Sequence, residues 1–169
     1  CLSNSAGIIA WPAGHGDWIR PGLMLYGVSP MANCTGQEHN LKPVMRLTTK
    51  VIAVRDVAAH ERVGYGGRWQ SDKPTQLAVV AMGYGDGYPR ELSMKGAEVW
   101  ISGQRCPLLG RVTMDQIMVD VSSLPECSSG DEVELFGENI LVSEVAQLAG
   151  AIPWSVLTGI TPRVTRIYT

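Results

Sequence analysis

The fold is decided by an alternating stretch, Met45-Arg46-Leu47-Thr48-Thr49-Lys50-Val51-Ile52-Ala53. The odd-numbered positions are mostly apolar, and Arg46, Thr48 and Lys50 stand between them. Successive side chains of a β-strand point to opposite faces, so this period of two predicts a half-buried strand.

Further short strands are expected on the C-terminal side of this stretch. Residues 77–82 are continuously apolar, which is typical of a strand covered on both faces. Residues 97–101 and 106–109 flank a turn that contains Gly103, a pattern that predicts a hairpin. Short strands at this spacing favour a β-sandwich or a barrel-like domain.

The last third of the chain continues the β pattern and then changes to a helix. Residues 112–121 predict a strand, and residues 132–136 with 140–142 predict a second hairpin. Residues 143–150 predict a short helix, because Ser143 is a favourable N-cap and Gly150 a favourable stop. The chain is therefore expected to be mainly β.

Composition excludes several function classes. The 169 residues are 45% hydrophobic, enough for one sizeable core or for a domain plus a piece of another. The longest apolar runs are far shorter than the roughly 20 residues that span a bilayer. A net charge of −2 gives no reason to expect nucleic acid or an anionic membrane as a partner. The four cysteines form no C-x-x-C pair, so we expect no metal site and a reducing cytoplasm.

The first 38 residues differ from the rest. Two short apolar stretches, 7–12 and 18–27, are separated by glycines and polar residues, and residues 27–40 form a connector that contains Pro30. Neither stretch could close a core alone. The chain begins with Cys1 and shows no signal-peptide pattern. A fragment of a longer protein is the expectation, with a mature lipoprotein as the alternative.

Two polar clusters in this region suit an anion. Asn4 and Ser5 offer an amide and a hydroxyl beside a glycine turn, which fits a phosphate but also fits a plain turn. Arg20 lies between apolar stretches, where a guanidinium needs a partner. That partner could be a ligand or a structural ion pair, and Gly22 could expose its backbone N–H to an anion.

Three glycines surround Tyr65, in the run Gly64-Tyr65-Gly66-Gly67. They leave the phenol unshielded and the backbone free to adopt unusual angles. This suits a general acid or base if a neighbouring cation lowers its pKa from about 10. It also suits an ordinary loop with a surface tyrosine.

Two further stretches carry unusual charge. Residues 83–90 form a glycine-rich loop after a buried strand, and Asp86 is placed to cap that loop's backbone. Residues 110–116 put Arg111 and Asp115 inside a predicted strand, where a carboxylate is unusual.

The order and spacing of these motifs resemble those of bacterial alanine racemase. The motifs are Ser3-Asn4-Ser5, Trp18-Ile19-Arg20-Pro21-Gly22-Leu23, Val63-Gly64-Tyr65-Gly66, Gly83-Tyr84-Gly85-Asp86-Gly87-Tyr88-Pro89-Arg90, Gly110-Arg111-Val112-Thr113-Met114-Asp115 and the closing Arg163-Val164-Thr165-Arg166. The resemblance covers essentially the whole chain. It implies a mainly β C-terminal domain over residues 39–169, preceded over residues 1–38 by the last segment of an α/β (TIM-type) barrel.

The resemblance also implies pyridoxal 5'-phosphate as cofactor. Asn4, Ser5, Gly22 and Leu23 match positions around its phosphate, which barrel enzymes commonly hold near the last strands. Arg20 matches an arginine facing the pyridine nitrogen, where it should weaken the ring as an electron sink.

Tyr65 matches the catalytic tyrosine, which in this family serves the active site of the partner subunit and so implies a homodimer. A tyrosine and the cofactor-bearing lysine act on opposite faces of the substrate α-carbon, as inversion of a stereocentre requires. Met114 matches a residue whose backbone meets the substrate carboxylate. The entrance corridor is matched by four residues: Tyr84, Arg90, Arg111 and Asp115.

The implied activity is interconversion of L- and D-alanine through a pyridoxal-phosphate aldimine, for peptidoglycan precursors or alanine catabolism. No motif of the Schiff-base lysine type occurs in these 169 residues, so the fragment alone is expected to be inactive and to need the missing N-terminal barrel portion. The alternatives are a racemase of serine or of broad amino-acid range, and a non-catalytic β-domain that binds a partner.

Overall fold

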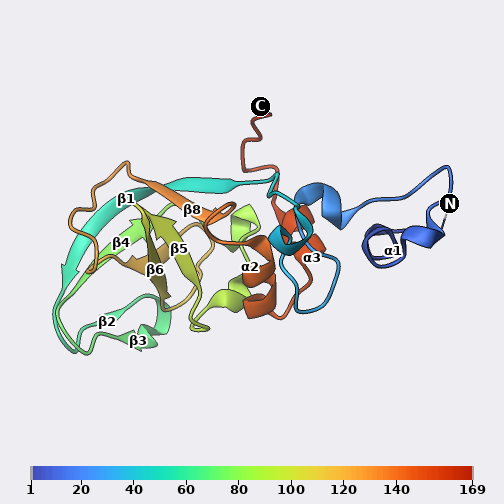
Figure 1. Ribbon diagram of the computed structural model, residues 1–169. Helices are drawn as coiled ribbons and strands as arrows, with labels where there is room; N and C mark the ends of the chain where they lie inside the picture. Colours follow the sequence, from blue (N-terminus) through green and yellow to red (C-terminus); the bar gives the residue numbers. More distant parts are fainter. Residues whose placement is uncertain (1, 169) are drawn as a thin grey trace.

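The computed structural model describes residues 2–168, so Cys1 lies outside the described part of the chain. It comprises a β-barrel, two helices packed at one end of it and an N-terminal segment that extends away (Figure 1). The strands are β1 (Leu47–Val57), β2 (Arg62–Val63), β3 (Trp69–Gln70), β4 (Thr75–Val80), β5 (Glu98–Ile101), β6 (Gln104–Leu109), β7 (Ile117–Asp120) and β8 (Glu132–Phe136). The α-helices are α1 (Ser5–Ala10), α2 (Val142–Ala149) and α3 (Pro153–Gly159).

Six of the strands form a closed antiparallel barrel in the order β1-β4-β7-β6-β5-β8. The first part of β1 pairs with β8, with Leu47 opposite Phe136, and its second part pairs with β4, with Val57 opposite Thr75. A register shift after Val51 separates the two halves. Such a bulge bends a strand, which lets β1 serve two neighbours and close the barrel. The expectation of a mainly β, sandwich or barrel-like domain is confirmed.

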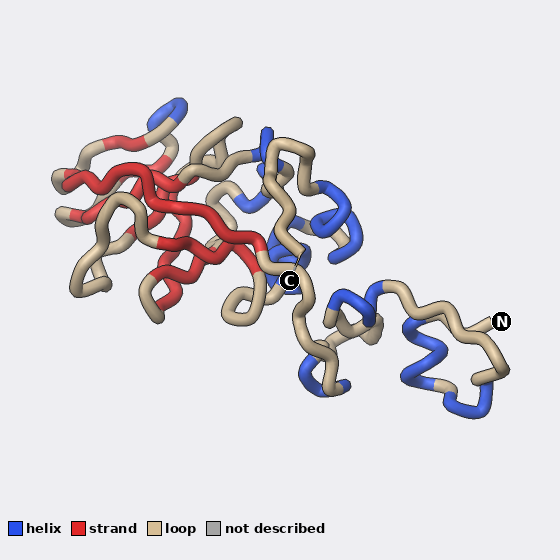
Figure 2. The backbone as a smooth tube through the Cα atoms, turned by 90° about the horizontal axis from the view of Figure 1, so that it is seen from above, coloured by secondary structure: helices blue, strands red, loops and turns tan. Residues whose placement is uncertain are grey.

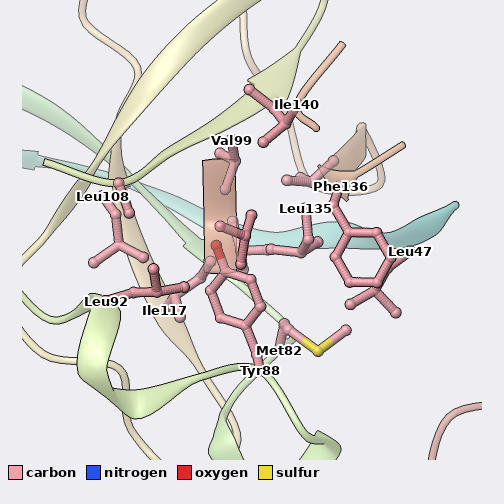
Figure 3. Packing of buried hydrophobic residues seen from close by; sticks show 14 of the residues in the cluster. Leu47, Met82, Tyr88, Leu92, Val99, Leu108, Ile117, Leu135, Phe136 and Ile140 are labelled. Atoms are coloured by element: carbon pink, nitrogen blue, oxygen red, sulfur yellow. The ribbon is translucent and has the colours of Figure 1, made fainter. Parts of the chain in front are cut away.

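The barrel interior is packed with apolar side chains from every wall (Figure 3). Ile117, Val133 and Leu135 are fully buried, and Phe136 packs beside Leu47. Complete burial of one such side chain contributes roughly 1.5–3 kcal/mol. The helix α2 adds Val145 and Ala146 to the same core, and α3 adds Val156 and Leu157. The barrel and these two helices therefore share one hydrophobic core.

Two predicted strands are wrong in extent. The strand predicted over residues 112–121 is confined to β7, because the carbonyls of Thr113 and Met114 accept hydrogen bonds from the neighbouring loop at Tyr84 and Gly85. Residues 140–142 form no strand. The buried Glu134 carboxylate accepts the N–H of Ile140, and α2 begins two residues later.

The predicted short helix is confirmed with a different first residue. Its N-cap is Leu141 rather than Ser143, and the Glu144 side chain returns to the Leu141 N–H at 3.4 Å. Gly150 ends the helix in the left-handed conformation, with φ 71°, as glycine allows.

The N-terminal segment contains α1 and two 3-10 helices, Pro12–Gly14 and Leu23–Tyr26. Figure 2 shows it as a thin extension of helix and loop at one side of the barrel. Trp11 and Trp18 are 71% and 77% exposed, although both side chains are largely apolar. Neither length nor hydropathy would let any helix within residues 2–168 traverse a lipid bilayer.

Candidate functional site

A cavity of about 1000 Å³ opens beside the barrel. Its walls come from three loops: the one between β2 and β3, the one after β4 and the one before β7. The structure brings together here every expected catalytic, substrate-binding and corridor residue: Tyr65, Tyr84, Arg90, Arg111, Met114 and Asp115. Within the described part of the chain, no group of three or more His, Cys, Asp or Glu residues could ligate a metal.

Tyr65 is presented by a small hairpin on the outside of the barrel. Gly64, Gly66 and Gly67 all have φ between 52° and 78°, angles that L side chains rarely adopt. This backbone turns the phenol outward, and Tyr65 is 75% exposed. Trp69 packs on the small apolar cluster of Val57, Leu77 and Leu109, which fixes the hairpin to the barrel. The expectation of an unshielded phenol on an unusual backbone is confirmed.

The two loops that carry the other pocket residues are bonded back to back. Tyr84 N–H donates to the carbonyl of Thr113, and Gly85 N–H donates to that of Met114, both at 2.9 Å. A Cβ at Gly83 would lie 2.2 Å from the Met114 carbonyl oxygen, so only glycine allows this approach. Asp86 Oδ2 accepts the Gly83 N–H at 2.9 Å, which confirms that Asp86 caps its own loop.

Charge in the cavity is divided between free and paired groups. Asp115 Oδ1 lies 2.5 Å from Nη2 of Arg163. Arg90 lies over the Tyr84 ring, 5.9 Å from its centroid. Arg90 and Arg111 have no carboxylate within 4.0 Å among residues 2–168. The cavity wall therefore carries two unpaired guanidinium groups, which suits a carboxylate ligand.

The residues expected around the cofactor phosphate gather in the N-terminal segment. Ser5 is buried, and its Oγ accepts the N–H of Gly22 at 2.8 Å and that of Met24 at 3.4 Å. Leu23 is buried directly beside them and begins a 3-10 helix. Ser5 donates its own hydroxyl proton to no acceptor among the described residues, so that proton is free for a ligand.

Asn4 and Arg20 lie next to each other in an isolated parallel bridge. Asn4 Oδ1 accepts the Gly7 N–H at 3.0 Å and so caps α1. Arg20 is exposed, and Nη2 donates to the Leu2 carbonyl at 3.1 Å. The alternative of a structural ion pair for Arg20 is wrong within residues 2–168, because no carboxylate lies within 4.0 Å of it.

The cavity residues and the residues of the N-terminal segment lie at opposite ends of the molecule. Tyr65 stands between β2 and β3 at one end of Figure 1, and Asn4 and Ser5 stand at α1 at the other end. One copy of this chain therefore does not bring Tyr65 to the residues expected around the cofactor phosphate.

Two residues near these groups had no predicted role in the site. Trp154 of α3 lies 3.6 Å from the position that a Cβ on Gly22 would take, so it packs beside the residues expected around the phosphate. Its position in a short helix after Pro153 indicates ordinary packing and nothing more. Arg163 is bound to both Asp86 and Asp115, and no local pattern indicates either contact.

Family models match nearly the whole chain. The model described as "Alanine racemase, C-terminal domain" matches residues 44–168, and "Alanine racemase, N-terminal domain" matches residues 1–30. A curated alanine racemase of Chromohalobacter salexigens is 48% identical over 168 residues, 99% of this chain and 46% of the relative. One from Aeromonas hydrophila is 49% identical over 167 residues, again 99% and 46%. The chain thus spans less than half of the length of these relatives.

Solved structures of alanine racemases are similar to this chain as well. The biosynthetic alanine racemase from Pseudomonas aeruginosa superposes with a TM-score of 0.93 at 45% identity, covering 99% of this chain and 46% of that one. Alanine racemase from Bartonella henselae, described with covalently bound pyridoxal phosphate, gives a TM-score of 0.89 at 34% identity, with the same coverage. Both the fold and the sequence lead to one conclusion: the chain belongs to the alanine racemase family.

Proposed function

We propose that these 169 residues form the tyrosine-bearing part of a pyridoxal-phosphate-dependent alanine racemase. One observation carries the proposal: the six expected catalytic, substrate and corridor residues, from three separate sequence stretches, line one cavity. In this proposal residues 1–38 are the end of the α/β barrel and residues 39–169 are the β-domain. This proposed boundary is supported by the two family matches, which leave residues 31–43 between them.

The N-terminal segment fits the phosphate of the cofactor. Ser5 has a free hydroxyl proton, and its Oγ is held by the N–H groups of Gly22 and Met24 at the start of the 3-10 helix Leu23–Tyr26. Asn4 adds an amide, and the exposed guanidinium of Arg20 would face the pyridine nitrogen. Pyridoxal phosphate, when bound, supplies an electron sink that acidifies the α-proton of the amino acid.

Tyr65 would hold or accept the α-proton at its phenolic oxygen on one face of the substrate. The second base, a lysine on the other face, is not supplied by these residues. The lysines of this chain are Lys42, Lys50, Lys73 and Lys95, and all four side chains are exposed. A lysine needs a desolvated setting to act as a base at neutral pH, so we expect no racemisation from this chain alone.

The cavity would receive the substrate carboxylate. Met114, Tyr84 and Asp115 line the cavity together with the unpaired guanidinium groups of Arg90 and Arg111, and in this proposal the Met114 backbone and the two arginines meet the carboxylate. A small amino acid would thus be oriented by its carboxylate before proton transfer.

The separation of the two residue groups supports a homodimer with a shared site. Tyr65 of one subunit would meet the cofactor held by residues such as Ser5 and Arg20 of the other. We place the enzyme in the cytoplasm, where Cys34, Cys106 and Cys127 would stay reduced. There it would supply D-alanine for peptidoglycan or serve alanine catabolism.

The test joins these 169 residues, in one polypeptide, to the part of a relative that they do not match. This protein is called the complete racemase below. We expect formation of D-alanine from L-alanine, measured by chiral chromatography, and no formation by the 169 residues alone with added pyridoxal phosphate. Activity of the chain alone would contradict the need for an external lysine. A dimeric, cofactor-loaded complete racemase without activity would favour a non-catalytic β-domain.

A further inference from the structure

Three segments that are far apart in sequence meet behind the cavity wall. They are the loop 83–87, the loop 113–116 and residues 161–163, which follow α3. Thr161 N–H donates to the Asp86 carbonyl at 3.0 Å, and Thr161 Oγ1 donates to the Gly85 carbonyl at 3.0 Å. The chain after α3 is therefore fastened to the loop that carries Tyr84.

Arg163 ties all three segments together. Its Nε lies 3.3 Å from Asp86 Oδ1, and its Nη2 lies 2.5 Å from Asp115 Oδ1. Its Nη1 is 2.4 Å from the position of a Cβ on Gly85, so the guanidinium rests directly on that backbone. The hydrogen bond to Asp115, with the charge of Asp86, raises the pKa of Arg163 above its ordinary value. The cation thus stays charged between two carboxylates.

We propose that Arg163 is a positioning residue, which sets the substrate-facing wall of the cavity by holding the Tyr84 loop and the Met114 loop together. The inference rests on the proposed function, because it assumes that this wall meets the substrate. Arg163 itself does not line the cavity. It acts through Asp115, which does, and through Asp86, which caps the Tyr84 loop.

The physical reason is that few hydrogen bonds join these two loops directly. Tyr84 and Met114 are both exposed, and among the described residues two backbone hydrogen bonds, Tyr84 to Thr113 and Gly85 to Met114, join the loops. Removal of the cation would leave Asp86 and Asp115 facing each other without a shared partner, and like charges disfavour close approach. The Met114 backbone would then shift away from the place where the substrate carboxylate binds.

Tyr65 lies on a different support. Its hairpin is anchored on the cluster of Val57, Leu77 and Leu109, and no hydrogen bond joins it to the Arg163 segments among the described residues. Loss of Arg163 should therefore disturb binding of the substrate more than proton transfer at Tyr65. This predicts that KM and kcat respond unequally.

The chain offers a matched control in Arg105. This arginine also bridges two carboxylates, with Nη1 at 3.3 Å from Glu98 and 2.8 Å from Glu144, and its side chain is similarly exposed, 40% against 48% for Arg163. It lines no part of the cavity. Arg105→Ala therefore removes a comparable bridge without touching the wall.

The experiment compares Arg163→Ala, Arg163→Lys and Arg105→Ala in the complete racemase, after each is shown to be dimeric and cofactor-loaded. For Arg163→Ala we expect KM for alanine to rise about tenfold, with kcat within about threefold of the parent, because a shift of 1 Å in a positioning group is costly. Arg163→Lys keeps the charge and should recover part of the KM. Arg105→Ala should leave KM unchanged.

A double variant tests whether Arg163 acts on the substrate through Asp115. If Arg163 acts through Asp115, Arg163→Ala with Asp115→Asn should raise KM no more than the stronger single change. Equal KM values for Arg163→Ala and Arg105→Ala would overturn the inference and leave the proposed function intact. An inactive parent enzyme would instead contradict the proposed function, so the two failures are distinguishable.

Discussion

The cavity around Tyr65 and the segment around Ser5 carry similar numbers of expected site residues and are built very differently. The cavity lies on loops that a closed, packed barrel holds from within this chain. The Ser5 segment consists of short helical turns and one isolated bridge, and its tryptophans face outward. Large exposed apolar side chains of this kind mark a surface that packs on other protein.

We infer from this difference that the two regions supply different parts of one catalytic site. In our proposal, the barrel presents the base Tyr65 and a wall that binds the substrate carboxylate. In the same proposal, the N-terminal segment contacts the cofactor phosphate and is supported by the rest of the α/β barrel. Variants in the two regions should therefore have different defects. Substitutions in the cavity should impair proton transfer or substrate binding, and substitutions in the Ser5 segment should weaken cofactor binding.

The largest effect is expected at the phenol of Tyr65. Tyr65→Phe removes the acid or base and leaves the ring, so kcat should fall roughly 10²–10⁴-fold, the usual contribution of a positioned proton-transfer group. Cofactor content should stay unchanged. Racemisation rates and the visible absorption of the complete racemase measure both. Loss of cofactor from Tyr65→Phe would instead indicate that Tyr65 helps to bind the cofactor, which would contradict this division of roles.

A smaller effect is expected from the buried carboxylate of Glu134, which is 1% exposed in the barrel wall. Burial alone would raise its pKa, but N–H groups of Asn139 and Ile140, the Asn139 amide and the Arg46 guanidinium outweigh it, so the pKa lies below its ordinary 4.5. A lowered folded pKa contributes stability that is present above the unfolded pKa and is lost as pH falls through the folded one.

Glu134→Gln should thus lower the free energy of unfolding by about 1–3 kcal/mol at neutral pH, since buried donors lose a charged acceptor. The gap to the parent should narrow as pH falls below 4.5. Denaturant unfolding of the complete racemase at several pH values measures it. The control is Glu132→Gln. Glu132 is an exposed partner of the same Arg46, so this substitution should change the free energy of unfolding little. A gap independent of pH would contradict this account of the barrel.

The smallest effect is expected at Ser5. Ser5→Ala removes one hydroxyl that holds Gly22 and has a proton free for the phosphate. Loss of one such hydrogen bond corresponds to about 1.5 kcal/mol, or roughly tenfold weaker cofactor binding. Equilibrium dialysis of the complete racemase measures the Kd for pyridoxal phosphate. Unchanged affinity together with a raised KM for alanine would assign Ser5 to the substrate instead.

Local pattern predicted much of the barrel and little of its closure. The alternation over residues 45–53 and the Gly103 turn predicted β1 and the β5–β6 hairpin, because both signals depend on neighbouring residues. The hydrogen bonds that keep residues 112–116 out of β7 come from the distant loop at Tyr84. The sequence nearby contains no sign of that partner, so the strand was predicted too long.

The site shows the same division. The glycines around Tyr65 indicated an exposed phenol, because their effect on the backbone is local. The residues expected at the cavity follow from their resemblance to a family, because the residues around Tyr65, taken alone, favour an ordinary loop with a surface tyrosine. Arg163 belongs to the closing motif of that resemblance but had no predicted role, and Trp154 was indicated by neither signal, since each contacts residues more than 45 positions away.

We propose that Tyr65 and the Ser5 segment of one chain serve different active sites. The most direct test mixes two inactive complete racemases, Tyr65→Phe and Arg20→Glu, and lets their subunits exchange. A site shared between subunits predicts recovery of about a quarter of the parent activity, because half of the dimers are mixed and each has one intact site. No recovery, with exchange verified by mass, would mean that both ends serve one site and would contradict the account.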